Sequence, residues 1–263
     1  MTSSSRILAI AFELIAVSAA LTGASRPDSL LDRLAQTTSR FWDQFSSVTC
    51  TEVVDQKKLQ ANGKTIVDKK STYDYLILLQ LTGDELTVEE SRIRHGKEPR
   101  EGDRSLLSTH GFSTLVLIFH PLFQPSYEFE DGGEAEWNGR RCRKLHFQHV
   151  PGRRSPSVLQ LHNRDYPIEW RGTAWIDMES ASVARIEADL KSPMPDIGLI
   201  RLASDVQYVP VAISGADTGL WAPRSAVVEA ATRRQRWQNT HTFSKYRQFQ
   251  VNTETTTENP KEQ

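Results

Sequence analysis

The seven histidines of the chain are the first residues to consider for metal binding or acid–base catalysis. His146 and His149 stand three residues apart on a predicted strand. Successive side chains on a strand point to opposite faces, so these two rings cannot share a metal ion. His110 and His120 flank an apolar segment and are interpreted as structural or solvent-exposed. No H-E-x-x-H motif is present, and the sequence predicts no metal site.

Nucleophilic catalysis finds no recognisable motif either. No serine stands in a G-x-S-x-G sequence, and Cys50, on a predicted strand, lacks the helix N-terminus that would lower its thiol pKa. Neither G-x-G-x-x-G nor a Walker loop is present. Glu128 and Glu130 share one face of a strand and are interpreted as solvated, not as a general-acid pair. We therefore expect no enzyme and no cofactor, with a hydrolase of unknown type as the less favoured alternative.

Composition and charge describe an ordinary globular protein. The chain has 263 residues, 38% of them hydrophobic, with a formal net charge of −1. Such a balance produces no long-range field that would attract nucleic acid. Basic clusters at 140–144 and 233–236 are interpreted as solvated strand and turn positions. We expect no nucleic-acid partner.

Residues 1–24 have the organisation of a secretory signal peptide. Arg6 supplies a positive charge, residues 7–21 form an apolar run too short for a transmembrane span, and residues 22–24 are small. Glu13 is the one acid inside the apolar run. The mature chain is expected to begin near Ser25, to be periplasmic or secreted, and to keep no stable membrane span after cleavage.

Export bears on the two cysteines, Cys50 and Cys142. In an oxidising compartment they can form one disulfide, whereas otherwise they would be two small buried thiols. A bridge requires Cα atoms within about 7 Å. The sequence leaves both alternatives open.

Hydrophobic periodicity predicts one amphipathic helix followed by many strands. Residues 27–45 carry apolar side chains at offsets of three, four and seven, typical of a helix that covers one face of a sheet. A membrane-surface helix is the alternative, but the polar face carries both Asp and Arg. Residues 252–263 are polar and predicted to be disordered.

Strand patterns fill most of the remaining chain. Residues 48–60 and 65–81 form a predicted hairpin around Asn62-Gly63, residues 85–94 alternate, and 131–133 is a predicted turn. In the hairpin of 171–190, one apolar face is expected to carry Ala174, Ile176, Ala184, Ile186, Ala188 and Leu190. The other face is expected to carry Trp175, Val183, Arg185 and Glu187. We expect a mainly β (α+β) fold with about nine to eleven antiparallel strands, too many for a flat sheet.

One apolar segment, 105–123, interrupts the strands. Phe112, Leu115, Val116, Ile118 and Phe119 fit a helix of two to three turns that stops before Pro121. The segment is unusually apolar for a connection between strands. It predicts a second, inserted helix.

The C-terminal half carries short motifs of a known superfamily. Trp175-Ile176-Asp177 leads into Val183-Ala184-Arg185-Ile186, and a strand starting Trp221, Pro223, Arg224 precedes a last one with Phe243, Tyr246, Arg247, Phe249. Over 170–251 in motif, and over the mature chain in element order, this resembles the periplasmic lipoprotein-carrier (LolA-like) superfamily. That group includes RseB-like anti-sigma regulators, outer-membrane lipoprotein-sorting proteins and secreted acidobacterial relatives.

The resemblance implies a single domain over 25–251, an incomplete β-barrel whose concave apolar face is covered by two helices and holds acyl chains. The residues expected to line the cavity are Leu115, Phe119, Ile176, Ile186 and Leu190. The expected function is a non-catalytic carrier or sensor of a lipid, a lipoprotein acyl chain or another apolar molecule. The alternative is a module of the RseB type that binds an envelope protein. For each lining residue, ordinary core packing competes with ligand contact.

Overall fold

The computed structural model describes residues 27–45, 48–82, 85–96, 106–161, 164–213 and 220–248. The predicted signal peptide, 1–24, and the predicted disordered tail, 252–263, lie outside these residues. Among the described helices, none has both the length and the apolar character needed to cross a bilayer.

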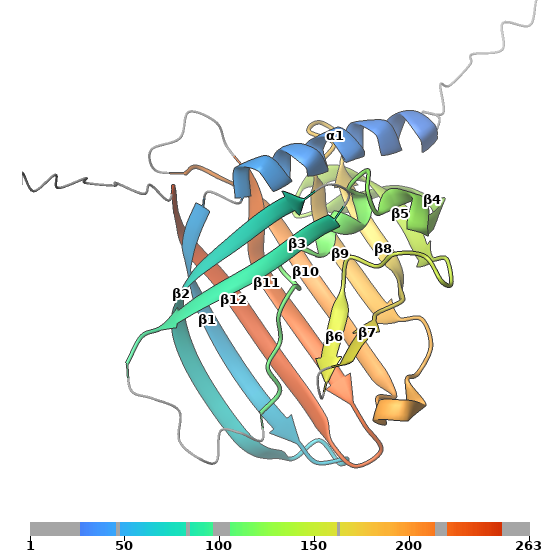
Figure 1. The fold of residues 1–263 in the computed structure, drawn as a ribbon. Coiled ribbons are helices and arrows are strands. Elements are labelled where there is room, and N and C mark those ends of the chain that lie inside the picture. Colours follow the sequence, from blue (N-terminus) through green and yellow to red (C-terminus); the bar gives the residue numbers. More distant parts are fainter. Residues whose placement is uncertain are drawn as a thin grey trace, which may run out of the picture.

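A single large antiparallel sheet dominates the protein (Figure 1). Its ten strands lie in the order β3-β2-β1-β12-β11-β10-β9-β8-β5-β4. Their bounds are β1 Val48–Leu59, β2 Thr65–Thr82, β3 Glu85–Arg94, β4 Tyr127–Trp137, β5 Arg140–His149, β8 Trp170–Asp177, β9 Val183–Leu190, β10 Arg201–Val211, β11 Leu220–Ala231 and β12 Arg236–Gln248. A separate hairpin pairs β6 (Val158–Leu161) with β7 (Arg164–Pro167). The predicted mainly β fold class is confirmed, and the ten strands of the main sheet fall within the predicted nine to eleven, while the separate hairpin brings the described strands to twelve.

The sheet curls but does not close. In the described residues β3 and β4 are its two edges and do not pair with one another. Register shifts interrupt several ladders, including β1/β12, β8/β9 and β10/β11. Such bulges increase strand bending and twist, and the strands wrap around an interior to give a half-barrel (Figure 1).

Helix α1 (Pro27–Phe45) lies across one end of the half-barrel (Figure 1). Its bounds are those predicted. Its apolar stripe is buried, with Leu34 at 0% and Phe45 at 2% exposure. Thr37 Oγ1 donates to the Ala181 carbonyl at 2.7 Å, which fixes the helix to the turn between β8 and β9.

The segment 106–126 runs along the concave side of the sheet and beneath α1 (Figure 1). The predicted helix of two to three turns is wrong. The segment contains only two short 3₁₀ helices, η2 (Leu115–Phe119) and η3 (Gln124–Ser126). A third, η4 (Pro195–Ile197), follows β9.

Tertiary hydrogen bonds explain why no longer helix forms there. Gly111 adopts a left-handed φ of 78°, which interrupts helix geometry before η2. The Val116 N–H donates to the Tyr208 hydroxyl at 3.2 Å instead of to a helical carbonyl. All five η2 residues are buried, whereas an amphipathic helix would keep one face exposed.

The predicted turn at 131–133 is also wrong, because the chain continues there as β4 with a bulge between Asp131 and Glu134. The β4–β5 turn lies instead at Asn138 and Gly139, both with positive φ. Gly133 has φ +80°, and a Cβ on Gly132 would stand 2.7 Å from His146 Nε2. The two glycines therefore serve a bulge, which shares its residue preferences with turns.

Candidate ligand-binding site

The five residues predicted to line a cavity come together in the interior. Ile176 and Ile186 are 0% exposed and Leu190 is 9% exposed, on β8 and β9. Leu115 and Phe119 come from η2. All five belong to one hydrophobic cluster that extends across the concave face. The period-2 pattern assigned Ile176, Ile186 and Leu190 to the correct face. It was wrong for Val183, which lies in the interior cluster, and for Ala184, which packs with Trp175, because a register shift interrupts the β8/β9 ladder there.

The concave face is occupied by the chain itself. Between α1, η2 and the sheet the structure leaves a crevice of about 20 Å³, the space of one water molecule. It is lined by Thr37, Thr38, Phe41, Val116, Ser182, Val183, Tyr208 and Trp221. The Thr38 hydroxyl, in a residue 2% exposed, has no hydrogen-bond partner among the residues that the structure describes. We call the described segment 106–126 the plug.

Side-chain hydrogen bonds hold the first part of the plug. The Leu107 carbonyl accepts from Gln56 Nε2 and from Asn239 Nδ2, both at 2.8 Å. Thr109 Oγ1 accepts from Asn239 Nδ2 at 2.9 Å and lies 2.7 Å from His241 Nε2. This part of the plug is therefore tied to β1 and β12.

Two buried tyrosines hold the next part. The Tyr75 hydroxyl lies 2.6 Å from Ser113 Oγ. The Tyr208 hydroxyl donates to the Ser113 carbonyl at 3.1 Å and accepts from Val116 N–H. Because Tyr75 lies on β2 and Tyr208 on β10, the plug is tied across the width of the sheet.

Beneath these contacts lie two buried carboxylates. Glu52, 0% exposed, accepts from Arg92 Nε at 2.5 Å and contacts His241 Nδ1 at 2.7 Å. Burial alone would raise the pKa of Glu52, but hydrogen bonds from His241 and Arg92 outweigh it and lower that pKa. Glu90 accepts from Gly111 N–H at 2.6 Å. Burial opposes its ionisation too, yet His110, Arg92 and Gly111 lower the pKa of Glu90.

Thr109, His241 and Glu52 have the order of a nucleophile, base and acid. Thr109, however, is 6% exposed, and its hydroxyl faces the sheet, where it bonds to Asn239 and lies against His241. The triad order therefore serves to attach the plug.

A second such order joins Ser108, His110 and Glu90. His110 Nδ1 lies 2.7 Å from Arg92 Nη1, which only donates, and 3.2 Å from Glu90 Oε2, which only accepts. His110 Nε2 lies 3.0 Å from Ser108 Oγ. The imidazole therefore joins the plug to the Arg92–Glu90 ion pair.

Of the two alternatives for the cysteines, the structure shows two separate thiols and no disulfide between them. Cys50 on β1 and Cys142 on β5 are free and buried. They lie in different hydrophobic clusters, Cys142 packing with Trp175 and Ala184 on the convex side. Burial, with the charge of Glu52, raises the pKa of Cys50 to about 12, so its thiol is unreactive at neutral pH.

Trp175 and Arg185 share a face, as predicted, and they stack on the convex side of the sheet. The Arg185 guanidinium lies 4.9 Å from the Trp175 ring centroid and 4.3 Å from that of Trp137. Asp205 binds the same guanidinium through both carboxylate oxygens. The charge of Arg185 is thus fully engaged within the fold.

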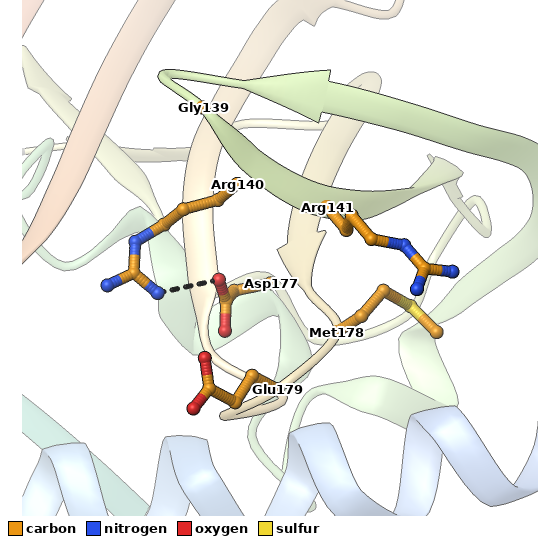
Figure 2. A pocket seen from close by; sticks show the side chains of 6 residues that line it. All are labelled: Gly139, Arg140, Arg141, Asp177, Met178 and Glu179. Carbon is orange, nitrogen blue, oxygen red and sulfur yellow. Dashed lines mark hydrogen bonds and ion pairs between the residues drawn. The ribbon is translucent and has the colours of Figure 1, made fainter.

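A larger, open pocket lies at the rim of the half-barrel, beside α1 (Figure 2). Its volume is about 720 Å³, and its lining residues are Gly139, Arg140, Arg141, Asp177, Met178 and Glu179. They come from the β4–β5 turn, the start of β5, the end of β8 and the β8–β9 turn. Sequence reasoning interpreted the basic residues here as merely solvated, because strand alternation does not reveal that two turns meet.

Comparison with known proteins gives distant structural similarities. No family model and no curated protein matches the chain. The chain is similar to a DUF1329 family protein from Desulfovibrio piger (12% identity, TM-score 0.44, covering 84% of this chain and 92% of that one). A putative outer membrane lipoprotein-sorting protein domain from Vibrio parahaemolyticus gives 11% identity and TM-score 0.45 over 86% and 94%. The Mycobacterium tuberculosis lipoprotein LppX gives 12% and 0.29 over 87% and 100%.

The acidobacterial relationship predicted from the sequence has no counterpart among these structures. Identities of 11–12% are too low to transfer a ligand, a partner or an activity to this chain.

Proposed function

We propose that the protein is a non-catalytic, periplasmic or secreted carrier or sensor of an apolar ligand. We further propose that the bound ligand takes the place of the plug on the concave face. One observation supports the proposal. One cluster of apolar side chains lines most of the concave face, and buried Glu52, Asn239 and His241 lie under the first part of the plug. The segment 106–126 covers this face without adding a strand, and its first part is attached to the sheet by side-chain hydrogen bonds. Such a cover can leave without breaking a strand ladder.

Replacing the plug by a ligand costs less free energy than removing the plug and leaving the concave face exposed to water. Removing η2 exposes apolar surface, and a bound acyl chain buries a similar kind of surface at about 25 cal/mol per Å². These two contributions largely cancel. The remaining cost is the loss of the hydrogen bonds between plug and sheet, at about 1 kcal/mol for each net hydrogen bond. The hydrogen bonds at Leu107, Thr109 and Ser113 would therefore set the affinity for the ligand.

The proposal divides the five predicted residues into two groups. Ile176, Ile186 and Leu190 belong to the sheet and would contact the ligand, which is an apolar small molecule or the acyl chain of a lipid or lipoprotein. Leu115 and Phe119 belong to the plug and would be displaced. Under this proposal Leu115 and Phe119 would compete with the ligand for the concave face instead of contacting the ligand.

The test weakens one tie and measures ligand binding. Thr109→Val removes the hydroxyl that bonds to Asn239 and His241. A fluorescent polyene fatty acid is titrated into mature protein, and we expect the variant to bind it roughly five- to tenfold more tightly than the wild type does. The control is Thr173→Val, which loses a hydroxyl bonded to His146 on the convex side.

Folded wild type and Thr109→Val that both fail to bind the fatty acid would contradict the proposal. Native mass spectrometry of the purified protein, with co-purified lipid expected, is an independent measurement. Delipidated protein that instead captures one envelope protein would favour the interaction-module alternative.

A further inference from the structure

We infer that the rim pocket, lined by residues 139–141 and 177–179, binds the zwitterionic headgroup of an amphiphile of the phosphoethanolamine class, whose apolar chain enters the concave face beneath α1. This inference rests on the proposed function and names the class of ligand.

Two opposite charges in the pocket are without partners in the part of the chain that the structure describes. The Arg141 guanidinium and the Glu179 carboxylate make no ion pair there, and both side chains line the pocket (Figure 2). The other two charges are engaged, since Arg140 Nη1 lies 3.0 Å from Asp177 Oδ2. Figure 2 shows these two groups on opposite sides of the pocket, so a ligand that carries both charges would lie across the pocket to meet them.

The wall between them is built to hold its shape. Asp177, 2% exposed, accepts from the backbone N–H and the hydroxyl of Ser180 at 2.8 and 2.7 Å. The Met178 N–H donates to the Arg141 carbonyl at 3.0 Å, joining the β8–β9 turn to β5. The Arg140 guanidinium rests 5.3 Å from the Trp221 ring centroid. A preorganised wall lowers the entropic cost of binding.

The pocket and the interior crevice lie along the same β8–β9 turn. Asp177, Met178 and Glu179 line the pocket, whereas Ser182 and Val183, a few residues further on, line the crevice beneath α1. The unpartnered Thr38 hydroxyl belongs to that crevice as well. A ligand lying across the turn can therefore keep its charged end outside and place its chain inside.

The hydrogen bonds between α1 and the β8–β9 turn would control the entry of the ligand chain. Arg33 Nη2 donates to the Met178 and Glu179 carbonyls at 3.5 and 3.4 Å, and Thr37 binds the Ala181 carbonyl. These are side-chain contacts to a turn. They can break while the strands stay paired.

The headgroup class follows from donors and acceptors. A guanidinium binds phosphate through paired N–H donors, which suits Arg141. A primary ammonium offers three N–H donors to the Glu179 carboxylate, whereas a quaternary ammonium offers none. A glycerol headgroup carries no positive charge. Phosphoethanolamine thus satisfies both free groups, and phosphocholine or phosphoglycerol satisfies one.

The test compares four ligands of equal chain length on the mature protein: lysophosphatidylethanolamine, lysophosphatidylcholine, lysophosphatidylglycerol and monoacylglycerol. Each displaces the fluorescent fatty acid. We expect lysophosphatidylethanolamine to bind about tenfold more tightly than lysophosphatidylcholine does. Arg141→Gln should weaken all three phospholipids about fivefold and leave monoacylglycerol unchanged. Glu179→Gln should abolish only the preference for ethanolamine over choline.

Arg153→Gln is the matched control, because this exposed arginine lies in the loop after β5, away from the pocket. Free phosphoethanolamine should bind at least a hundredfold more weakly than the lysolipid does, since it lacks the chain. Binding of monoacylglycerol with no gain for the lysophospholipids would overturn the headgroup site and leave the proposed function intact. Failure of every chain-bearing ligand, monoacylglycerol included, would overturn the proposed function and this inference with it.

Discussion

At the scale of single residues, the cysteines give the first prediction. Cys50 and Cys142 are free and buried, and burial raises the pKa of both thiols. We expect a thiol reagent to modify neither cysteine in the native protein at pH 8 and both after unfolding in guanidinium. Unfolded, unreduced protein that shows no reactive thiol would demonstrate a disulfide and contradict the structure at these positions.

Gly172 gives a second residue-scale prediction. A Cβ at this position would lie 2.0 Å from the Glu187 carbonyl oxygen and 2.7 Å from Phe147 Cζ. Because backbone of β9 blocks the methyl group, Gly172→Ala should lower the free energy of unfolding by about 3 kcal/mol. Urea unfolding followed by tryptophan fluorescence measures this loss. Gly63→Asn, in a turn with nothing within 4 Å, is the control and should change stability by less than about 1 kcal/mol.

Residue facing on regular strands was predictable, whereas backbone irregularities were not. Alternation correctly placed Trp175 opposite Ile176 and brought Arg185 to the tryptophan. The same approach misread Gly132-Gly133, because a bulge and a turn use the same glycine conformations. Only the partner strand β5, which approaches Gly132 closely, distinguishes the two.

At the scale of elements, the plug shows where local pattern and tertiary contacts conflict. Leu115 to Phe119 are apolar in every direction, which is compatible with a buried helix or with irregular buried chain. The decisive contacts come from Tyr75, Tyr208 and Asn239, which lie 38 to 130 residues from their partners in the plug. Helix α1 was predictable because its stripe and its start signals are local.

The plug's attachment predicts a local effect of Tyr208→Phe. This change removes the hydroxyl that binds both Ser113 carbonyl and Val116 N–H, but keeps the ring against Phe41. Hydrogen exchange of residues 113–119 should accelerate about fivefold, since one or two net hydrogen bonds are lost. Tyr73→Phe on β2 serves as the control. Equal acceleration in both variants, or none in Tyr208→Phe, would show that this hydroxyl does not hold the plug.

At the scale of the whole molecule, the curl of the sheet was predictable, and the filling of its interior was not. Strand number and a single dry face per strand require curling. Whether the resulting hollow is open depends on the path of 106–126, which long-range hydrogen bonds determine. The strand pattern is the same for a filled and for an open half-barrel. This is why the sequence predicted the fold class better than the binding site.

The buried carboxylates Glu52 and Glu90 make the stability of the assembled molecule depend on pH. The groups facing them are Arg92 on β3, His241 on β12, and Tyr75 and His110 from β2 and the plug. Both carboxyl groups have a lowered pKa in the folded protein, so the unfolded chain binds more protons as pH falls below their ordinary value of 4.5. Their stabilising contribution is therefore complete above about pH 5 and is lost as pH falls through the lowered pKa values.

Glu52→Gln tests this dependence. The variant keeps an acceptor for Arg92 but loses the charge, so at pH 7 it should unfold at lower urea concentration than the wild type does. Between pH 5 and pH 3 its stability should fall less steeply, because one titrating group has been removed. Glu128→Gln, on the exposed side of β4, should keep the steep wild-type slope. If all three proteins lose stability with the same slope below pH 5, Glu52 does not contribute to the pH dependence of stability.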